Sequence, residues 1–490
     1  MNQDVRNLEP KALWNKFADL NAVPRASKKE ERVIAFMKKF GEGLGLETLV
    51  DSVGNVIIRK PATLGMEDRK MIVLQSHLDM VHQKNNDIDF DFETQPIQMY
   101  IDGDWVRAKG TTLGADNGLG VATIMAILES NSISHPALEA LFTIDEETGM
   151  TGAMGLKEGL LKGEILLNLD TEEDDEIGVG CAGGIDITAS QTYTEKTAPE
   201  NAVGYQINVK GLQGGHSGMD IHKGLGNANK LMNRLLFSVS QPNMHISFID
   251  GGSLRNAIPR ESVAVIVIAT QNVKSVLEQL QQAATDIQEE YKSLEPHLQI
   301  DILPAEKPEL VMPVTLQNQL LKAMYTAHNG VYRMSPEIKD LVETSNNIAR
   351  VLVKDGNIHI GCLTRSSVES SKMDLTNALQ SAFELMGCSV TKSGSYPGWA
   401  PNMKSPILNV LDELYQKMNG KRANIAACHA GLECGILGQN YPEMDMISFG
   451  PTIKGAHSPD ERASISSVQK YWDFMLEILK NIPKKINQHF

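Results

Sequence analysis

The sequence predicts an α/β protein with a mostly parallel sheet, interrupted by an inserted α+β domain. Two observations lead to this prediction. Up to about residue 184, and again from about 397, apolar strand-like segments alternate with helical ones, an order typical of layered domains with a parallel sheet. Between 185 and 396 the strands instead alternate apolar and polar residues, which indicates sheets with one covered and one open face. We therefore expect one domain from residues 1–184 and 397–490, and a second from 185–396.

The first domain is expected to begin with two helices, continue with strands around one apolar helix, and end with a helix. The helices are predicted at 9–22 and 28–44, where apolar residues recur at helical spacing, and near 466–481. The strands, and the apolar helix among them, are expected at 53–59, 71–75, 119–128, 138–143 and 165–170. Ligands of open α/β sheets bind at the carboxyl ends of the strands, so functional residues are expected there.

The inserted segment contains strands such as 205–209 and 349–353, joined by long polar helices at 219–237 and 274–293. Its two halves have a similar order of strands and helices, which indicates two similar subdomains. The segment is also much longer than a single small domain of roughly 100 residues.

Composition and charge exclude several classes of protein. The chain has 490 residues, and a hydrophobic content of 42% is too high for a mainly disordered chain. Lys and Arg number 46 against 61 Asp and Glu, a formal net charge of −15, so nucleic acid is not an expected partner. The most apolar run, 263–269, is far shorter than the ~18 residues that span a bilayer, so no membrane association is expected.

Location can be predicted from the N-terminus and the cysteines. The first residues lack the apolar core of a secretory signal. Five cysteines, an odd number spread thinly over the chain, indicate reduced thiols rather than a disulfide framework. We therefore expect a cytoplasmic protein.

The first chemical motif follows the strand at 71–75. His77 and Asp79 stand two positions apart, so they point to the same side at a strand end. Asp79 can therefore accept a hydrogen bond from the imidazole nitrogen of His77 that does not bind a metal. Taken alone, the pair is equally consistent with a structural or surface role.

The second motif, at 111–120, places Asp116 among three glycines directly before the apolar helix. An aspartate is a good helix cap, but a cap does not explain Gly114, Gly118 and Gly120. Glycines at this density indicate a backbone that bends sharply and approaches another group closely, which favours a functional loop.

Further acidic and histidine residues lie near other strand ends. Asp145, Glu146 and Glu147 follow the strand at 138–143. Adjacent carboxylates repel one another, and a nearby cation would relieve that cost, although a solvated acidic loop is the alternative. Asp170 ends another buried strand, and His457 lies in a loop near the C-terminus.

These residues form one set of metal-ligand type, with two imidazoles and three carboxylates: His77, Asp116, Glu147, Asp170 and His457. Mixed nitrogen and oxygen ligands suit zinc, cobalt or manganese better than calcium or magnesium. A bridging carboxylate could hold two such ions about 3.5–4 Å apart and generate a hydroxide between them.

The motifs resemble those of the di-zinc exopeptidases of the carboxypeptidase, aminoacylase and dipeptidase family. They are most similar to its aminoacyl-histidine dipeptidase branch, the Xaa-His dipeptidases or bacterial carnosinases. The resemblance runs over essentially the whole chain and includes the segments 111–118, 211–218 and 251–259. It implies a zinc-exopeptidase-like catalytic domain and an inserted lid domain of two ferredoxin-like halves.

The resemblance also implies a role for each residue of the first domain's set. Asp116 bridges the two metals, His77 and Asp170 complete one shell, and Glu147 and His457 complete the other. Asp79 orients His77. Glu146 is the general base, which takes a proton from the bridging water and returns it to the leaving amine, and burial should raise its pKa toward the working pH.

For the lid, the resemblance implies substrate contacts. His216 would stabilise the oxyanion of the tetrahedral intermediate. Asn256 and Arg365 would bind the free carboxylate of the substrate, Arg365 through its planar fork. In shorter relatives the lid histidine reaches the active site of the neighbouring subunit, and the longer lid here could supply that group within one chain.

The implied function is a cytoplasmic metal-dependent dipeptidase that acts on small dipeptides and prefers Xaa-His substrates, including β-alanyl-histidine. Its expected cofactors are two zinc ions per chain, with cobalt or manganese as substitutes, and its expected state is a homodimer. One alternative is an aminoacylase or amidase that releases an acyl group from an N-acyl amino acid with the same metal site. Another is a catalytically silent binding protein of the same fold, against which the complete ligand set argues.

Overall fold

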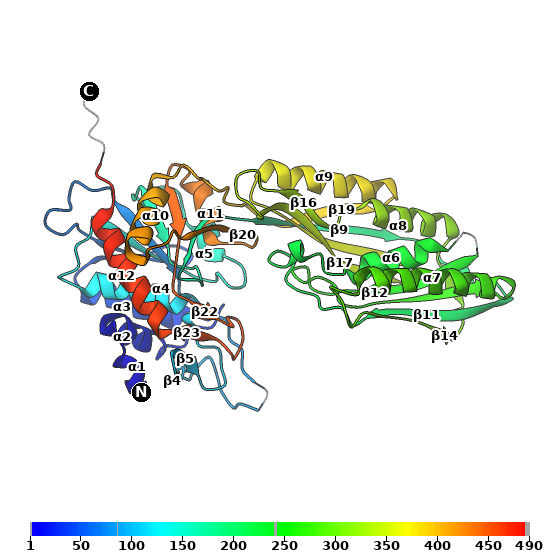
Figure 1. Cartoon of the computed structure of the whole chain (residues 1–490), viewed down its shortest axis with the longest axis horizontal. Coiled ribbons are helices and arrows are strands. Elements are labelled where there is room, and N and C mark those ends of the chain that lie inside the picture. The colour runs from blue at the N-terminus through cyan, green and yellow to red at the C-terminus, as the bar shows by residue number, and fades with distance from the viewer. Residues whose placement is uncertain (1, 86, 240–242, 486–490) are drawn as a thin grey trace, which may run out of the picture. The chain divides into compact units, whose positions relative to one another are not determined.

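The chain folds into two units, each with its own sheet (Figure 1). The computed structural model describes residues 2–85, 87–239 and 243–485. The first unit comprises Met1–Gly180, Pro401–Ala427 and Glu433–Phe490, and the second comprises Cys181–Ala400 and Cys428–Leu432. The sequence placed the boundaries at 184/185 and 396/397, within a few residues of this division, and did not anticipate the short return of 428–432 to the second unit.

An eight-stranded sheet forms the centre of the first unit. Its order is β1 (Glu47–Val50), β2 (Val56–Lys60), β6 (Leu138–Thr143), β3 (Ile72–His77), β7 (Ile165–Asn168), β21 (Asp445–Ser448), β8 (Glu176–Cys181) and β20 (Asn424–Cys428). The four central strands from β6 to β21 are parallel, whereas β1, β2 and β8 pair antiparallel. Every residue of β3, β6 and β7 is buried, as expected for parallel strands covered on both faces. The predicted α/β class is confirmed.

Helices surround this sheet. They are α1 (Gln3–Arg6), α2 (Lys11–Leu20), α3 (Glu31–Gly43), α4 (Ala115–Glu129), α5 (Thr151–Gly155), α10 (Pro406–Asn419), α11 (Glu433–Asn440) and α12 (Ile465–Asn481). Helix α4 is buried nearly all round and packs against α2 and β3, which explains why its sequence is apolar on every face. A small four-stranded sheet completes the unit, with the order β22 (Ile453–Lys454), β23 (Arg462–Ser464), β5 (Trp105–Ala108) and β4 (Met99–Asp102).

The second unit is built on a nine-stranded antiparallel sheet. Its order is β14 (Gln299–Ala305), β11 (Ala202–Lys210), β13 (Ser262–Ala269), β12 (Met244–Gly251), β17 (Val342–Lys354), β18 (Asn357–Ser366), β9 (Gly183–Thr192) and β19 (Ser389–Tyr396), with β16 (Gly330–Met334) paired to β17. A two-stranded ribbon of β10 (Lys196–Thr197) and β15 (Leu310–Val311) accompanies it. The helices are α6 (Ala228–Ser238), α7 (Val273–Tyr291), α8 (Val314–Thr326) and α9 (Glu369–Leu385), with short 3-10 turns at Ile221–Lys223 and Thr270–Asn272.

This sheet consists of two ferredoxin-like halves, as predicted. The first half is the continuous run β11-α6-β12-β13-α7-β14, and the second is β9-α8-β17-β18-α9-β19. The whole first half is inserted between β9 and α8 of the second. The halves join where β12 pairs with β17, and residues of α6 to α9 share one apolar core with the sheet. That single covered face explains the alternating strand pattern.

One predicted helix of this unit is wrong at its start. The sequence placed a helix at 219–237, but α6 begins only at Ala228, after the 3-10 turn that ends at Gly224. Gly224 adopts a φ of 72°, which ends the turn, and the side chain of Asn227 accepts hydrogen bonds from the amides of Asn229 and Lys230. The helix therefore starts at its cap and not where its polar residues begin.

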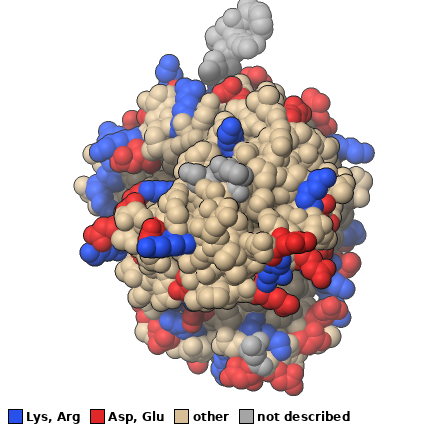
Figure 2. Space-filling model, turned by 90° about the vertical axis from the view of Figure 1, so that its right-hand side faces the viewer, with Lys and Arg blue, Asp and Glu red and all other residues tan. Residues whose placement is uncertain are grey.

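Charged side chains of both signs are interspersed over the face that Figure 2 presents. Among the described residues, no helix has both the length and the apolar character needed to cross a bilayer.

Candidate metal centre

The predicted ligands of the first unit come from the edge where the parallel strands end. His77 is the last residue of β3, Glu146 and Glu147 follow β6, and Asp170 follows β7. Since β6, β3 and β7 are parallel neighbours, these side chains meet at one edge of the sheet. Asp116 lies in the first turn of α4, where the backbone at Asp116 and Asn117 departs from helical geometry.

The structure brings His77, Asp116 and Asp170 together, with ligand atoms that all lie within 4.8 Å of one another. His77 Nε2 lies 3.2 Å from Asp116 Oδ1 and 3.6 Å from Asp170 Oδ1. Asn117 holds Asp170 in place, because the side-chain nitrogen Nδ2 of Asn117 donates to an Asp170 carboxylate oxygen and to the Leu169 carbonyl.

A second group of ligand atoms within 4.8 Å of one another comes from Asp116, Glu147 and His457. His457 lies in the loop between β22 and β23, and its Nε2 is 3.3 Å from Asp116 Oδ2 and 3.0 Å from Glu147 Oε2. The two oxygens of Asp116 therefore face different histidines, Oδ1 toward His77 and Oδ2 toward His457. That is the disposition of a carboxylate able to bridge two ions.

Asp79 connects these ligands to their loops. Its Oδ1 lies 3.3 Å from His77 Nδ1, on the side of the ring away from Asp116. Asp79 also accepts hydrogen bonds from the amides of Glu146 and Glu147, at 3.0 and 3.3 Å, and from Ser27 Oγ at 2.7 Å. One carboxylate thus contacts the imidazole and also binds the turn that carries both glutamates.

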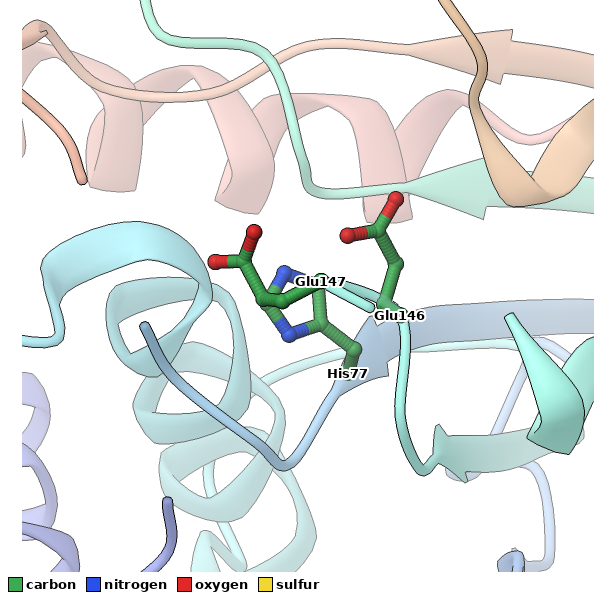
Figure 3. Close-up of side chains that lie close together, drawn as sticks. All are labelled: His77, Glu146 and Glu147. Atoms are coloured by element: carbon green, nitrogen blue, oxygen red, sulfur yellow. The ribbon is translucent and has the colours of Figure 1, made fainter. Parts of the chain in front are cut away.

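The three consecutive carboxylates at 145–147 have separate environments. Asp145 is buried and accepts hydrogen bonds from Lys28 Nζ and Thr151 Oγ1, both at 2.6 Å, so it is a structural residue of the turn. Glu147 lies beside the imidazole of His77, whereas the carboxylate of Glu146 projects to another side (Figure 3). Glu146 and Glu147 each offer an oxygen within 4.8 Å of His77 and of one another.

Burial and charge shift the protonation equilibria of this cluster. Burial raises the pKa of Glu146 well above its usual value, and the carboxylates of Asp170, Glu147 and Glu433 act in the same direction. Burial also raises the pKa of Asp170 to about 6. Hydrogen bonds to Asp116 and Glu147 raise the pKa of His457 to about 11, so the carboxylates strongly favour positive charge at this place.

The residues fit a pair of divalent cations. Three carboxylates and two imidazoles supply mixed oxygen and nitrogen donors, and the negative field that raises the pKa of His457 would equally stabilise a metal ion. Within the part of the chain that the structure describes, the buried Glu147 Oε1 has no hydrogen-bond partner, as expected of an oxygen whose partner is an ion.

The three predicted lid residues lie in the second unit and are linked through Ser217. Its amide donates to the Asn256 carbonyl at 2.8 Å, and its Oγ lies 3.4 Å from Arg365 Nε. Arg365 is buried and donates to Tyr396 Oη at 2.9 Å, whereas Asn256 is exposed. His216 Nδ1 accepts from the amides of Gly218 and Met219, so the proton of the neutral ring is on Nε2.

Four buried or half-buried ionisable residues near the centre were not assigned from the sequence: Arg25, Glu172, Glu433 and Glu461. Burial raises the pKa of Glu172 and of Glu433 to about 8. Glu433 Oε2 accepts from Gln75 Nε2 and Thr143 Oγ1, each at 2.6 Å, below the carboxyl ends of β3 and β6. Glu461 ends the same loop as His457, which was the one signal in the sequence that pointed to it.

Comparison with known proteins identifies the family. Residues 73–481, most of the chain, match the model of peptidase family M20/M25/M40. The chain belongs to this family. The expected resemblance to the exopeptidase family, and the expectation of a peptide hydrolase, are therefore confirmed.

Several known proteins match nearly the whole length of this chain. The cytosol non-specific dipeptidase of Escherichia coli (strain K12) is 44% identical over 487 residues, which cover 98% of this chain and 100% of that protein. The crystal structure of aminoacylhistidine dipeptidase from Vibrio alginolyticus is 43% identical, with a TM-score of 0.92, and covers 98% of this chain and 99% of that one. Aminopeptidase PepT from Bacillus cereus, at 15% identity and a TM-score of 0.57 over 97% and 99% of the two chains, shares the fold.

Proposed function

We propose that this chain is a metal-dependent dipeptidase that hydrolyses dipeptides and prefers a C-terminal histidine, as in β-alanyl-histidine. The observation that carries the proposal is the pair of ligand groups that share Asp116, one on each of its carboxylate oxygens. Two full-length relatives, the Escherichia coli and Vibrio alginolyticus proteins, are both named as dipeptidases, which supports the reaction class.

Two zinc ions would be held in these groups, the first by His77, Asp116 and Asp170, and the second by Asp116, Glu147 and His457. Cobalt or manganese would be accepted by the same donors. When bound, such ions supply Lewis acidity that polarises the scissile carbonyl and makes a water easier to deprotonate.

Glu146 would move the proton. Its carboxylate is close to the proposed ligands but belongs to neither of the two ligand groups that contain Asp116. Its raised pKa suits a residue that both accepts and returns a proton. Glu146 would accept the proton of the attacking water and deliver it to the nitrogen of the breaking peptide bond, so that the amine leaves neutral. Asp79 would hold the His77 ring and the backbone of Glu146 in fixed positions for this transfer.

The second unit would bind and polarise the substrate. Because the two amides at Nδ1 fix the proton of the neutral His216 ring on Nε2, this nitrogen can donate to the developing oxyanion. Arg365 and Asn256 would bind the substrate's free carboxylate. The guanidinium of Arg365 is positioned by Ser217 and Tyr396, so little side-chain freedom is lost on binding.

Location and assembly are part of the same proposal. The thinly spread cysteines of the sequence and the word cytosol in the name of the Escherichia coli relative support a cytoplasmic location. We propose a homodimer, which light scattering on the purified chain would test by its mass.

The test is hydrolysis of a matched substrate panel by the zinc-loaded chain, with and without a chelator. Chelator-sensitive release of amino acids from β-alanyl-histidine and glycyl-histidine, faster than from alanyl-alanine, is the expected result. Equal rates on all three substrates would support the dipeptidase activity but overturn the histidine preference. Such a result would agree with the name of the Escherichia coli relative, a non-specific dipeptidase. Cleavage of N-acetyl amino acids in place of free dipeptides would overturn the dipeptidase in favour of an aminoacylase.

A further inference from the structure

The glycine-rich loop that carries Asp116 is held from two sides by buried charged side chains. The side chain of Glu461 is 2% exposed and accepts hydrogen bonds from four consecutive backbone amides of this loop. Its Oε2 accepts from Leu113 and Gly114, at 2.7 and 2.9 Å, and its Oε1 accepts from Ala115 and Asp116, at 2.7 and 3.2 Å. Both carboxylate oxygens of Glu461 therefore bind the backbone of Asp116, the proposed bridging ligand, and of the three residues before it.

Arg25 contacts the same loop through its carbonyl side. Its exposed fraction is 1%, and its Nη2 donates to the Gly114 carbonyl at 2.5 Å. Its Nη1 donates to the carbonyls of Leu78 and Asp79, both at 3.1 Å. One guanidinium thus ties the segment directly after His77 to the loop of Asp116.

This arrangement explains two of the three glycines of the motif. A Cβ atom at Gly114 would lie 2.5 Å from Arg25 Nη2, and one at Gly118 would lie 2.6 Å from the same nitrogen. Gly114 also has a φ of 69°, a conformation that other residues rarely adopt. The spacing of these two glycines leaves room for a buried arginine that comes from a distant part of the chain.

The two side chains also link three of the five segments that carry proposed ligands. Glu461 lies four positions after His457 in the same loop, which is closed by the hydrogen bonds from Ser458 to Gly455 and from Glu461 to Ser458. The loop of His457 is therefore tied to that of Asp116 through Glu461, and the segment of His77 and Asp79 is tied to it through Arg25.

We infer that Arg25 and Glu461 are positioning residues that set the two oxygens of Asp116 against His77 and His457, and so hold the geometry of the two-ion centre. This inference rests on the metal centre of the proposed function. Neither side chain belongs to a ligand group, so each acts through the backbone of the Asp116 loop. Substitutions of such supporting groups typically weaken metal affinity by roughly 10- to 100-fold.

The test is a zinc titration of the metal-free chain by calorimetry, with the stability of the metal-free chain measured in parallel by thermal unfolding. The variants are Glu461→Gln, which keeps the size but replaces one acceptor oxygen with a donor, and Arg25→Lys, which keeps the charge but loses the fork that reaches three carbonyls. Both should fold and bind zinc about 10- to 100-fold more weakly than the unsubstituted chain, and kcat should fall with little change in KM.

Glu139→Gln is the matched control. Glu139 is also a fully buried carboxylate; it accepts from the amides of Lys162 and Gly163 and from Arg59 Nε, but it lies near the start of β6, at the other end of the strand from the ligands. This variant should lose stability and keep the zinc affinity.

Unchanged zinc affinity in Glu461→Gln and Arg25→Lys, or an equal loss in Glu139→Gln, would overturn the positioning role while the metal centre stood. Lower thermal stability of Glu461→Gln or Arg25→Lys without a loss of zinc affinity would also overturn the positioning role. An unsubstituted chain that binds no zinc, cobalt or manganese would instead overturn the proposed centre, and this inference with it.

Discussion

Glu146 and Glu147 show how two adjacent carboxylates come to have different surroundings. The amides of both residues are bound by Asp79, which fixes the turn, and the side chains then diverge. Glu147 shares its group with Asp116 and His457, whereas Glu146 does not. Removal of one should therefore affect ion binding, and removal of the other should affect proton transfer.

The first prediction follows from this division. Glu146→Gln should bind as many zinc ions as the unsubstituted chain, by elemental analysis, because Glu146 belongs to neither of the two ligand groups that contain Asp116. Its turnover of β-alanyl-histidine should fall by roughly 10²–10⁴-fold, the usual contribution of a general base. Near-normal turnover at full zinc occupancy would show that another group carries the proton.

A second prediction concerns pH and Glu433. Burial raises the pKa of this carboxyl to about 8 from an unfolded value of about 4.5, so the folded chain binds the proton more tightly than the unfolded chain. The stabilisation is fully present below pH about 4.5 and is lost as the pH rises toward about 8. Glu433→Gln, which resembles the protonated acid, should therefore reduce the fall in stability of the metal-free chain across this window.

Denaturant unfolding of the metal-free chain at several pH values measures this effect. Asp170 and Glu172, whose pKa values burial raises to about 6 and about 8, also titrate in the window, so the slope should shrink without disappearing. An unchanged slope in Glu433→Gln would mean that Glu433 is ionised throughout.

Residues near one another in sequence were the predictable part of the site. His77 and Asp79 could be paired because a strand end places positions two apart on one side. Asp116 and His457 could be grouped from their residue types as possible metal ligands, but only the family resemblance implied how they share a centre, since no periodicity links positions so distant in the chain. Arg25 and Glu461 contact backbone atoms, which a pattern of side-chain types does not reveal, and only the position of Glu461 in the loop of His457 pointed to it.

At the scale of elements, periodicity identified strands and helices well and their ends less well. The apolar helix at 119–128 corresponds to α4, because burial on all sides leaves a continuous apolar run. The predicted start of α6 was wrong because the turn that ends at Gly224 and the cap Asn227 both lie within the segment assigned to one helix, so these boundary residues were not used. The pairing of β9 with β18 and β19 was equally invisible, because the whole first half separates them in sequence.

The third prediction tests the cap of α6. Asn227→Ala removes the acceptor for two helix amides, which alone should cost about 1 kcal/mol or more. It also removes donors to Asn329 Oδ1 and the Ile348 carbonyl, which face the buried side of the helix, so the total loss should exceed that of a surface cap. Denaturant unfolding should show lower stability, while zinc affinity should not change, because every proposed ligand lies in the other unit. Weaker zinc binding in this variant would contradict that separation.

At the scale of the whole molecule, the proposed ligands and the proposed substrate-binding residues are divided between two separately folded units. The first unit is itself assembled from three stretches of chain, and the insertion of the second leaves its sheet intact. The second unit has its own apolar core, shared by both ferredoxin-like halves. Ion binding and substrate activation should therefore respond to different substitutions.

The last prediction uses this division. His216→Ala lies in the second unit and removes the Nε2 donor, so it should lower kcat by roughly 10²–10³-fold, the usual effect of losing one oxyanion donor. Zinc stoichiometry and affinity should be unchanged, in contrast to Glu461→Gln. Reduced zinc binding in His216→Ala would show that this histidine serves the metal centre itself, and a normal kcat would remove it from the reaction.

Arg365→Lys is the companion variant in the same unit. It keeps a charge for the substrate carboxylate but loses the planar fork, so it should raise KM more than it lowers kcat.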